Sequence, residues 1–230
     1  MGNRAQAQIY RAPSLAVLVL AVGLSGCVAA AIPLYYAASA GIAAYSGFTV
    51  YKSVQLTSGG SVSVASQGKD GKAAPAQPLP VVRRVAVWPE NEGEVLFSEH
   101  LTKSGRYDVT PPARVSVILA DAKIPRNLNE LTQAEQTTAF NTVCKVSGAE
   151  MIFADRTLGT SADQKNFSLS RANITSTVEL LAFSCAQQTM VWRDQMALIV
   201  ELGGKVPSTG EMMQVAADAW ADRVMQAPSI

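Results

Sequence analysis

The sequence predicts an α/β (α+β) domain over residues 81–230, with a mixed sheet of about five strands, a long C-terminal hairpin and roughly three to four flanking helices. Three observations indicate this fold class. Short apolar runs alternate with capped, helix-prone segments in the first half of the domain. Two long β-prone runs, residues 174–185 and 190–202, flank a polar turn. Apolar residues then recur at helical spacing over residues 208–227.

The domain opens with a strand at residues 81–89, which ends at a proline. Asn91, followed three residues later by Glu94, has the spacing of a capping box and predicts a helix that ends near Gly105. Residues 107–109 are β-prone and predict a second, short strand.

Two further helices follow. Thr110 stands before a proline, which predicts an N-cap and a helix over residues 112–120. Thr132 and Glu135 again have the spacing of a capping box, and the longer helix that they open should stop at Gly148. Residues 150–155 then form an apolar strand, which suits a central place in the sheet, and a polar loop over residues 156–171 leads to the hairpin.

The segment ahead of this domain has the features of a signal peptide. Residues 1–26 contain Arg4 and Arg11 but no acidic residue, and residues 15–24 are an apolar core of suitable length. Leu24-Ser25-Gly26-Cys27 closes that core and resembles the lipobox of bacterial lipoproteins. The resemblance implies cleavage before Cys27 and acylation of this cysteine, with palmitate among the acyl chains. Each buried CH₂ contributes about 0.8 kcal/mol, so several chains give a lasting membrane anchor.

The position of Val28 predicts the destination. In lipoproteins of enteric-type bacteria, an aspartate after the acylated cysteine retains the protein in the inner membrane, and this chain has valine there. The resemblance therefore implies the outer membrane, with the protein facing the periplasm.

Residues 27–65 are expected to form an acylated, apolar N-terminal segment followed by a hairpin. Residues 28–51 carry no charge, and three interpretations stay open: a helix on the membrane, a membrane-inserting part of an oligomer, or a helix packed on the domain. Residues 48–65 alternate around Gly59 and Gly60, which predicts the hairpin. Residues 66–80 are rich in Gly, Pro and Ala, a composition that predicts a linker.

The charge balance excludes one large class of function. The chain has 19 basic and 18 acidic residues. Removal of residues 1–26 would leave 17 basic and 18 acidic residues, a formal charge of −1. A nucleic-acid partner needs a basic surface to neutralise phosphates, so none is predicted.

Cys144 and Cys185 are the cysteines beyond Cys27. In an exported protein they are free to form a disulfide, and the alternative is a pair of buried thiols. Sequence separation does not give the Cα distance that decides between them.

Three short stretches resemble one superfamily of envelope proteins. They are residues 85–89 (Val-Ala-Val-Trp-Pro), residues 105–115, and the Gly-Ala-Glu-Met-Ile-Phe-Ala of residues 148–154. Their order resembles the α/β domain of curli-secretion-channel lipoproteins, of lipoprotein activators of penicillin-binding proteins and of the amino-terminal domain of the Tol-system propeller protein. The resemblance implies a domain that binds envelope proteins or self-associates. The stretch at residues 121–131 departs from the pattern, so no named pathway is carried over.

The sequence predicts no catalytic residue, metal site, cofactor or small-molecule substrate. His100 is the single histidine, and it lies in no catalytic or metal-ligand spacing. The acidic residues Asp155, Glu179 and Asp194 are scattered, and no two of them form an evident acid–base pair. The three tryptophans are expected in the core, with Trp192 the best candidate for an interface.

The sequence thus predicts a non-enzymatic lipoprotein of the outer membrane that binds or assembles envelope proteins. One alternative is an oligomeric component of an outer-membrane secretion channel. A second alternative is an envelope hydrolase or a solute-binding protein, which should have a concave pocket lined by convergent polar groups.

Overall fold

The computed structural model describes residues 48–69, 72–164, 172–202 and 207–230, which belong to one compact unit. The predicted signal peptide, Cys27 and residues 28–47 lie outside the described residues. The strands are β1 (Phe48–Gln55), β2 (Ser61–Lys69), β3 (Lys72–Ala73), β4 (Arg84–Val87), β5 (Asp108–Thr110), β6 (Met151–Gln164), β7 (Ala172–Ser184) and β8 (Thr189–Glu201). The helices are α1 (Gly93–Lys103), α2 (Pro112–Asp121), α3 (Gln133–Ser147) and α4 (Thr209–Gln226), with a short 3₁₀ helix at Leu128–Glu130.

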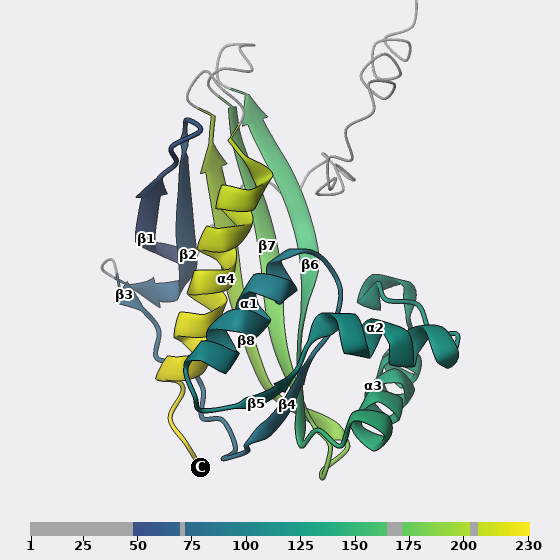
Figure 1. Ribbon diagram of the computed structural model, residues 1–230. Helices are drawn as coiled ribbons and strands as arrows, with labels where there is room; N and C mark the ends of the chain where they lie inside the picture. Colours follow the sequence, from purple (N-terminus) through teal and green to yellow (C-terminus); the bar gives the residue numbers. More distant parts are fainter. Residues whose placement is uncertain (1–47, 70–71, 165–171, 203–206) are drawn as a thin grey trace, which may run out of the picture. The chain divides into compact units, whose positions relative to one another are not determined.

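All of these strands belong to one mixed sheet, in the order β1-β2-β8-β7-β6-β4-β5, with β3 paired to β2 beside this path (Figure 1). β4 runs parallel to both β5 and β6, and the other pairs are antiparallel. The predicted α/β class, with its long C-terminal hairpin and flanking helices, is confirmed.

The hairpin of β1 and β2 extends this sheet rather than standing apart from it. β2 pairs with β8, with Val62 opposite Val200 and Val64 opposite Leu198. Gly59 and Gly60 make the turn with φ of 113° and 77°, a conformation that glycine adopts without strain. The stretch of residues 66–80 contains the end of β2 and all of β3. Leu79 then forms an isolated parallel β-bridge with Ser229 near the C-terminus.

The predicted polar loop at residues 156–171 is wrong for its first part, because β6 continues to Gln164. β7 pairs with it along its whole length, from Met151 opposite Ser184 to Gln164 opposite Ala172. The backbone hydrogen bonds offered by a long neighbouring strand outweigh the polar composition, and Thr160 and Ser176 also share a hydrogen bond of 3.1 Å across the pair.

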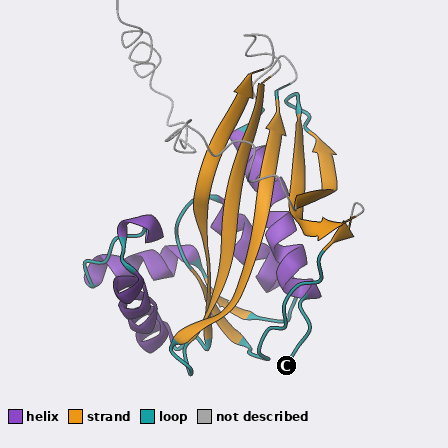
Figure 2. Ribbon diagram, turned by 180° about the vertical axis from the view of Figure 1, so that it is seen from behind, coloured by secondary structure: helices purple, strands orange, loops and turns teal. Residues whose placement is uncertain are grey.

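Helices α1 and α4 cover one face of the sheet, and α2 and α3 pack on the other (Figures 1 and 2). Alternation along β6 sends Phe153 to one face and Ile152 to the other. On the first face lies the α1–α4 core, which includes Phe97, Phe153, Leu180, Trp192, Met196, Trp220 and Val224. On the second lies the α2–α3 core, which includes Trp88, Leu119, Phe140, Val143, Ile152 and Phe183. No helix in the described ranges is long and apolar enough to span a membrane.

Candidate functional site

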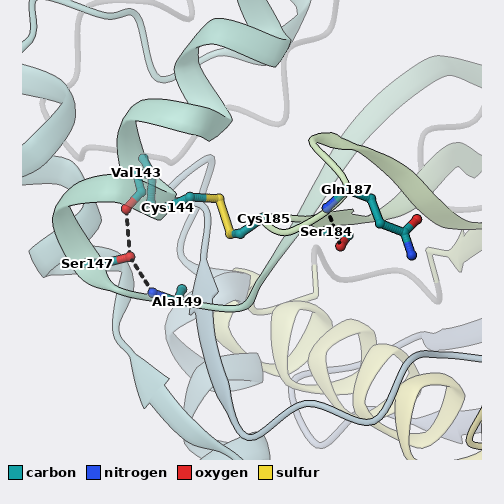
Figure 3. Close-up of a disulfide and its surroundings, with 7 residues drawn as sticks. All are labelled: Val143, Cys144, Ser147, Ala149, Ser184, Cys185 and Gln187. Atoms are coloured by element: carbon teal, nitrogen blue, oxygen red, sulfur yellow. Dashed lines mark hydrogen bonds between the residues drawn. A yellow bond between two sulfur atoms is a disulfide. The ribbon is translucent and has the colours of Figure 1, made fainter.

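The two cysteines beyond Cys27 meet at the edge of the α2–α3 core. Cys144 on α3 and Cys185, which follows β7, are joined by a disulfide with a Cα–Cα distance of 5.6 Å (Figure 3). Phe140 and Val143 place this face of α3 against the sheet. The hydroxyl of Ser147 donates a hydrogen bond of 2.6 Å to the carbonyl of Val143 and so fixes the end of α3 close to the disulfide. The sequence left open whether these cysteines form a disulfide or stay buried thiols, and the distance between them is that of a disulfide.

Trp192, the best candidate for an interface among the three tryptophans, is buried in the core, as the sequence predicts for all three. Its side chain lies in the α1–α4 core with 2% of its surface exposed, and its indole N–H donates to the carbonyl of Gln77 at 3.1 Å. Alternation along β8 turns it towards α4, a direction that composition alone does not give. Trp88 and Trp220 are also buried, as expected.

His100 links α1 to α4. Its Nε2 lies 2.7 Å from Asp218 Oδ1 and 3.0 Å from Gln214 Nε2, both on α4. About one third of each side chain of the His100–Asp218 pair is exposed. The contact therefore joins two helices at the surface of the protein.

Glu94 and Asp155 form a buried acid pair that the sequence did not reveal. Glu94 lies in the first turn of α1 and Asp155 on β6, with 1% and 4% of their surfaces exposed. Burial, together with the charge of Asp155, raises the pKa of Glu94 to about 12. Burial also raises the pKa of Asp155, although the neighbouring side chain of Glu94 acts in the opposite direction. The Asn91–Glu94 spacing indicated a surface cap, so no signal in the sequence pointed to burial of the glutamate.

Glu90 lies at the edge of this acid pair. Its Oε2 accepts a hydrogen bond of 3.2 Å from the backbone of Leu128. Burial and the charge of Asp155 raise the pKa of Glu90 to about 7. Within the described ranges, no group of three or more His, Cys, Asp or Glu side chains is arranged to hold a metal ion.

An open hollow of about 530 Å³ lies beside β5. Its lining includes Arg84, Thr102, Tyr107, Asp108, Thr110 and Ser147. β5 ends the sheet path, so its outer edge has no strand partner among the described residues. Polar side chains together with an unpaired strand edge suit contact with an extended polypeptide better than enclosure of a small molecule.

Fixed charges border this hollow. Arg83 Nε lies 2.8 Å from Asp108 Oδ2, and Glu150 Oε2 accepts the backbone N–H groups of Arg83 and Arg84 at 3.0 and 2.9 Å. These backbone donors lower the pKa of Glu150. The carboxylates beside the hollow are thus engaged in holding β4 and β5.

Comparisons with known proteins give likenesses of structure and none of sequence. No protein-family model matches the sequence, and no curated protein matches it. The structure is similar to a PelC dodecamer from Paraburkholderia phytofirmans, with 12% identity and a TM-score of 0.36 over 73% of this chain and 98% of that one. It is also similar to lipoprotein GNA1162 from Neisseria meningitidis, with 13% identity and a TM-score of 0.38 over 64% of this chain and 100% of that one. A third similar structure is the LpoB C-terminal domain from Salmonella enterica, with 9% identity and a TM-score of 0.35 over 53% of this chain and 86% of that one.

Proposed function

We propose that the chain is a lipoprotein anchored through Cys27 in the outer membrane, where its periplasmic domain is a non-catalytic binding or assembly factor for envelope proteins. The lipobox-like Leu24-Ser25-Gly26-Cys27 after an apolar run carries this proposal. The Cys144–Cys185 bridge supports it, because disulfides persist in the oxidising compartment outside the inner membrane.

Substitution of Cys27 tests the anchor. Cys27→Ala should give an unprocessed chain that takes up no labelled palmitate, while Cys144→Ala should label like the wild type. Membrane fractionation should place the wild type with the outer membrane. Normal acyl labelling of the Cys27 variant would reject the anchor, and an inner-membrane location would reject the destination.

We assign partner binding to the hollow beside β5, with an extended segment of an envelope protein as the partner. The concave polar lining and the outer edge of β5 support this assignment. Thr102→Arg places a large cation in the hollow. The matched control is Thr138→Arg, since both threonines lie on exposed helix faces and bond the carbonyl four residues earlier. Crosslinking followed by capture of the anchored protein should lose its specific partner with Thr102→Arg alone. Equal capture by both variants would reject the hollow.

The sheet favours one alternative, an oligomeric channel component. β1 and β5 end the sheet path of the described residues at opposite sides, so copies have two unlike edges for head-to-tail contact. Mass measurement in detergent decides between the two functions. A ring of defined mass would favour the channel, and a monomer across a wide concentration range would favour the binding factor.

A further inference from the structure

Three buried polar side chains from three elements meet around one small cavity. Glu94 comes from α1, Asp155 from β6 and Trp220 from α4, and the last has 3% of its surface exposed. The cavity has a volume of about 10 Å³, and all three residues line it. Glu94 Oε1, Asp155 Oδ1 and Trp220 Nε1 have no hydrogen-bond partner among the described residues.

Two ionised carboxylates are not stable at this place. A buried carboxylate needs a cation or several donors, and an unpaired one costs several kcal/mol. The charged side chain that borders the pair is another acid, Glu90, which repels it. Arg223 lies one turn after Trp220 on α4, but its guanidinium forms an ion pair with Asp194 on β8 and donates a hydrogen bond to the carbonyl of Ala74.

A backbone hydrogen bond assigns the role of one oxygen of Glu94. The N–H of Asn91 donates to Glu94 Oε2 at 2.5 Å, so this oxygen acts as an acceptor. A proton on Glu94 Oε1 turns that oxygen into a donor towards Asp155. One proton then satisfies both carboxyl oxygens that otherwise have no partner.

The indole N–H of Trp220 still needs a hydrogen-bond acceptor, and the cavity has room for one. A volume of 10 Å³ holds about one water molecule, provided that the water has two or more polar neighbours. A water there accepts from Trp220 Nε1 and donates to the free lone pairs of Glu94 and Asp155. Gly93 permits the close approach of the indole, because a Cβ at this position would lie 3.2 Å from the Trp220 ring.

We propose that Glu94 and Asp155 share one proton and, with Trp220 Nε1, bind a single buried water between α1, β6 and α4, so that the packing of these elements weakens as the pH rises. The proton is released to solvent when the pair loses it, and two negative charges then face each other in the buried site. The site thus makes the fold of the domain sensitive to alkaline conditions.

The direction in which stability changes with pH follows from the raised pKa of Glu94. The unfolded chain releases this proton near the ordinary pKa of 4.5, whereas the folded chain holds it to about 12. The stabilisation is therefore complete below about pH 4.5 and falls as the pH rises through this range. For one retained proton, the ratio of folded to unfolded protein falls about tenfold per pH unit.

Glu94→Gln tests the shared proton, because the amide keeps the shape and a donor towards Asp155 but does not ionise. Unfolding of the full chain in detergent is measured at pH 8 and pH 10, where Glu90 is already ionised. Between these values the ratio of folded to unfolded protein should fall about 100-fold more for the wild type than for Glu94→Gln. Glu92→Gln, an exposed neighbour, should behave like the wild type. Parallel curves for all three proteins would overturn the proposal.

Two measurements on the wild type do not depend on a variant that folds. The infrared spectrum at pH 9 should contain the carbonyl band of a protonated carboxyl group, and its absence would overturn the shared proton. A high-resolution crystal structure of the full chain should show one water about 3 Å from Trp220 Nε1. A closed cavity without that density would overturn the water site.

Discussion

Helices α1 and α3 begin with the same sequence pattern but in opposite environments. Thr132 and Glu135 form a complete capping box at an exposed helix start, and hydrogen bonds from Thr132 lower the pKa of Glu135. At α1, the N–H of Asn91 donates to Glu94 in the same way, but burial raises the pKa of Glu94. Local sequence therefore sets the hydrogen bonds of a cap, whereas the charge of its glutamate depends on what packs over it.

The same contrast extends to the two cores. The α1–α4 core contains the acid pair and is bordered by the Arg223–Asp194 ion pair. The α2–α3 core is apolar, with Phe140 between Trp88 and Phe183 and a disulfide at its edge. We therefore expect charge and pH to govern the stability of the α1 side, and packing and redox state to govern that of the α3 side.

The largest effect is expected from Asp194→Ala. Arg223 has only 4% of its side chain exposed, and loss of Asp194 leaves this cation buried with the carbonyl of Ala74 alone. Removal of one partner from a buried ion pair costs about 4 kcal/mol. Chemical denaturation measures this loss. Asp222→Ala breaks the exposed pair with Lys52 and should cost about 0.5 kcal/mol, so equal losses would reject the contrast.

Loss of the disulfide should destabilise the α3 side by about 3 kcal/mol, because the bridge closes a loop with a sequence separation of 41 residues. The double variant Cys144→Ala, Cys185→Ala is compared with the wild type in thermal unfolding, with and without reductant. Reductant should lower the stability of the wild type only. Before reduction, the wild type should yield no alkylatable thiol from either cysteine, and two modified thiols would contradict the bridge.

Glu90→Gln should raise stability at pH 8 and leave it unchanged at pH 4. The pKa of Glu90 is raised to about 7, so its stabilisation is complete below its ordinary value of 4.5 and is lost as the pH rises to 7. The difference at pH 8 should reach about 3 kcal/mol, measured by denaturation at both pH values. A variant that is equally stabilised at both values would show that the charge of Glu90 is not the cause.

The smallest effect is expected from Thr132→Ala at the exposed cap of α3. Loss of the side-chain acceptor for the N–H of Glu135 should cost about 1 kcal/mol. The hydroxyl of Thr138 bonds a carbonyl within the same helix, so Thr138→Ala is the control and should change stability little. The stability lost in Thr132→Ala should be smaller at low pH, because protonation of Glu135 weakens the hydrogen bond that its carboxylate accepts from the N–H of Thr132. An equal cost for both threonines would argue against the cap.

Most elements of the fold were predictable because their signals are local. The capping box at Thr132 and the stop at Gly148, whose φ is 69°, fix both ends of α3. The hairpin of β7 and β8 followed from two β-prone runs around a polar turn. The extension of β6 was not predictable, because its polar residues are strand only by pairing with β7.

The candidate sites depended much more on tertiary structure. The hollow beside β5 brings together residues from α1, α3, β4 and β5, which no motif connects. Glu94 and Asp155 are 61 positions apart in the numbering, and each looked ordinary in its own segment. Trp192 was kept as a candidate for an interface because its aromatic character was visible in the sequence and the direction of its side chain was not.

The sequence by itself determined the class of fold, the capped start and the glycine stop of α3, and the signal and lipobox pattern that predicts an anchor at Cys27. These properties depend on spacing within a few residues of the chain. Only the tertiary structure decided the place of Trp192, the pairing of Cys144 with Cys185 and the burial of Glu94 against Asp155. Distance and dielectric environment control these features, and both arise when segments far apart in the chain pack together.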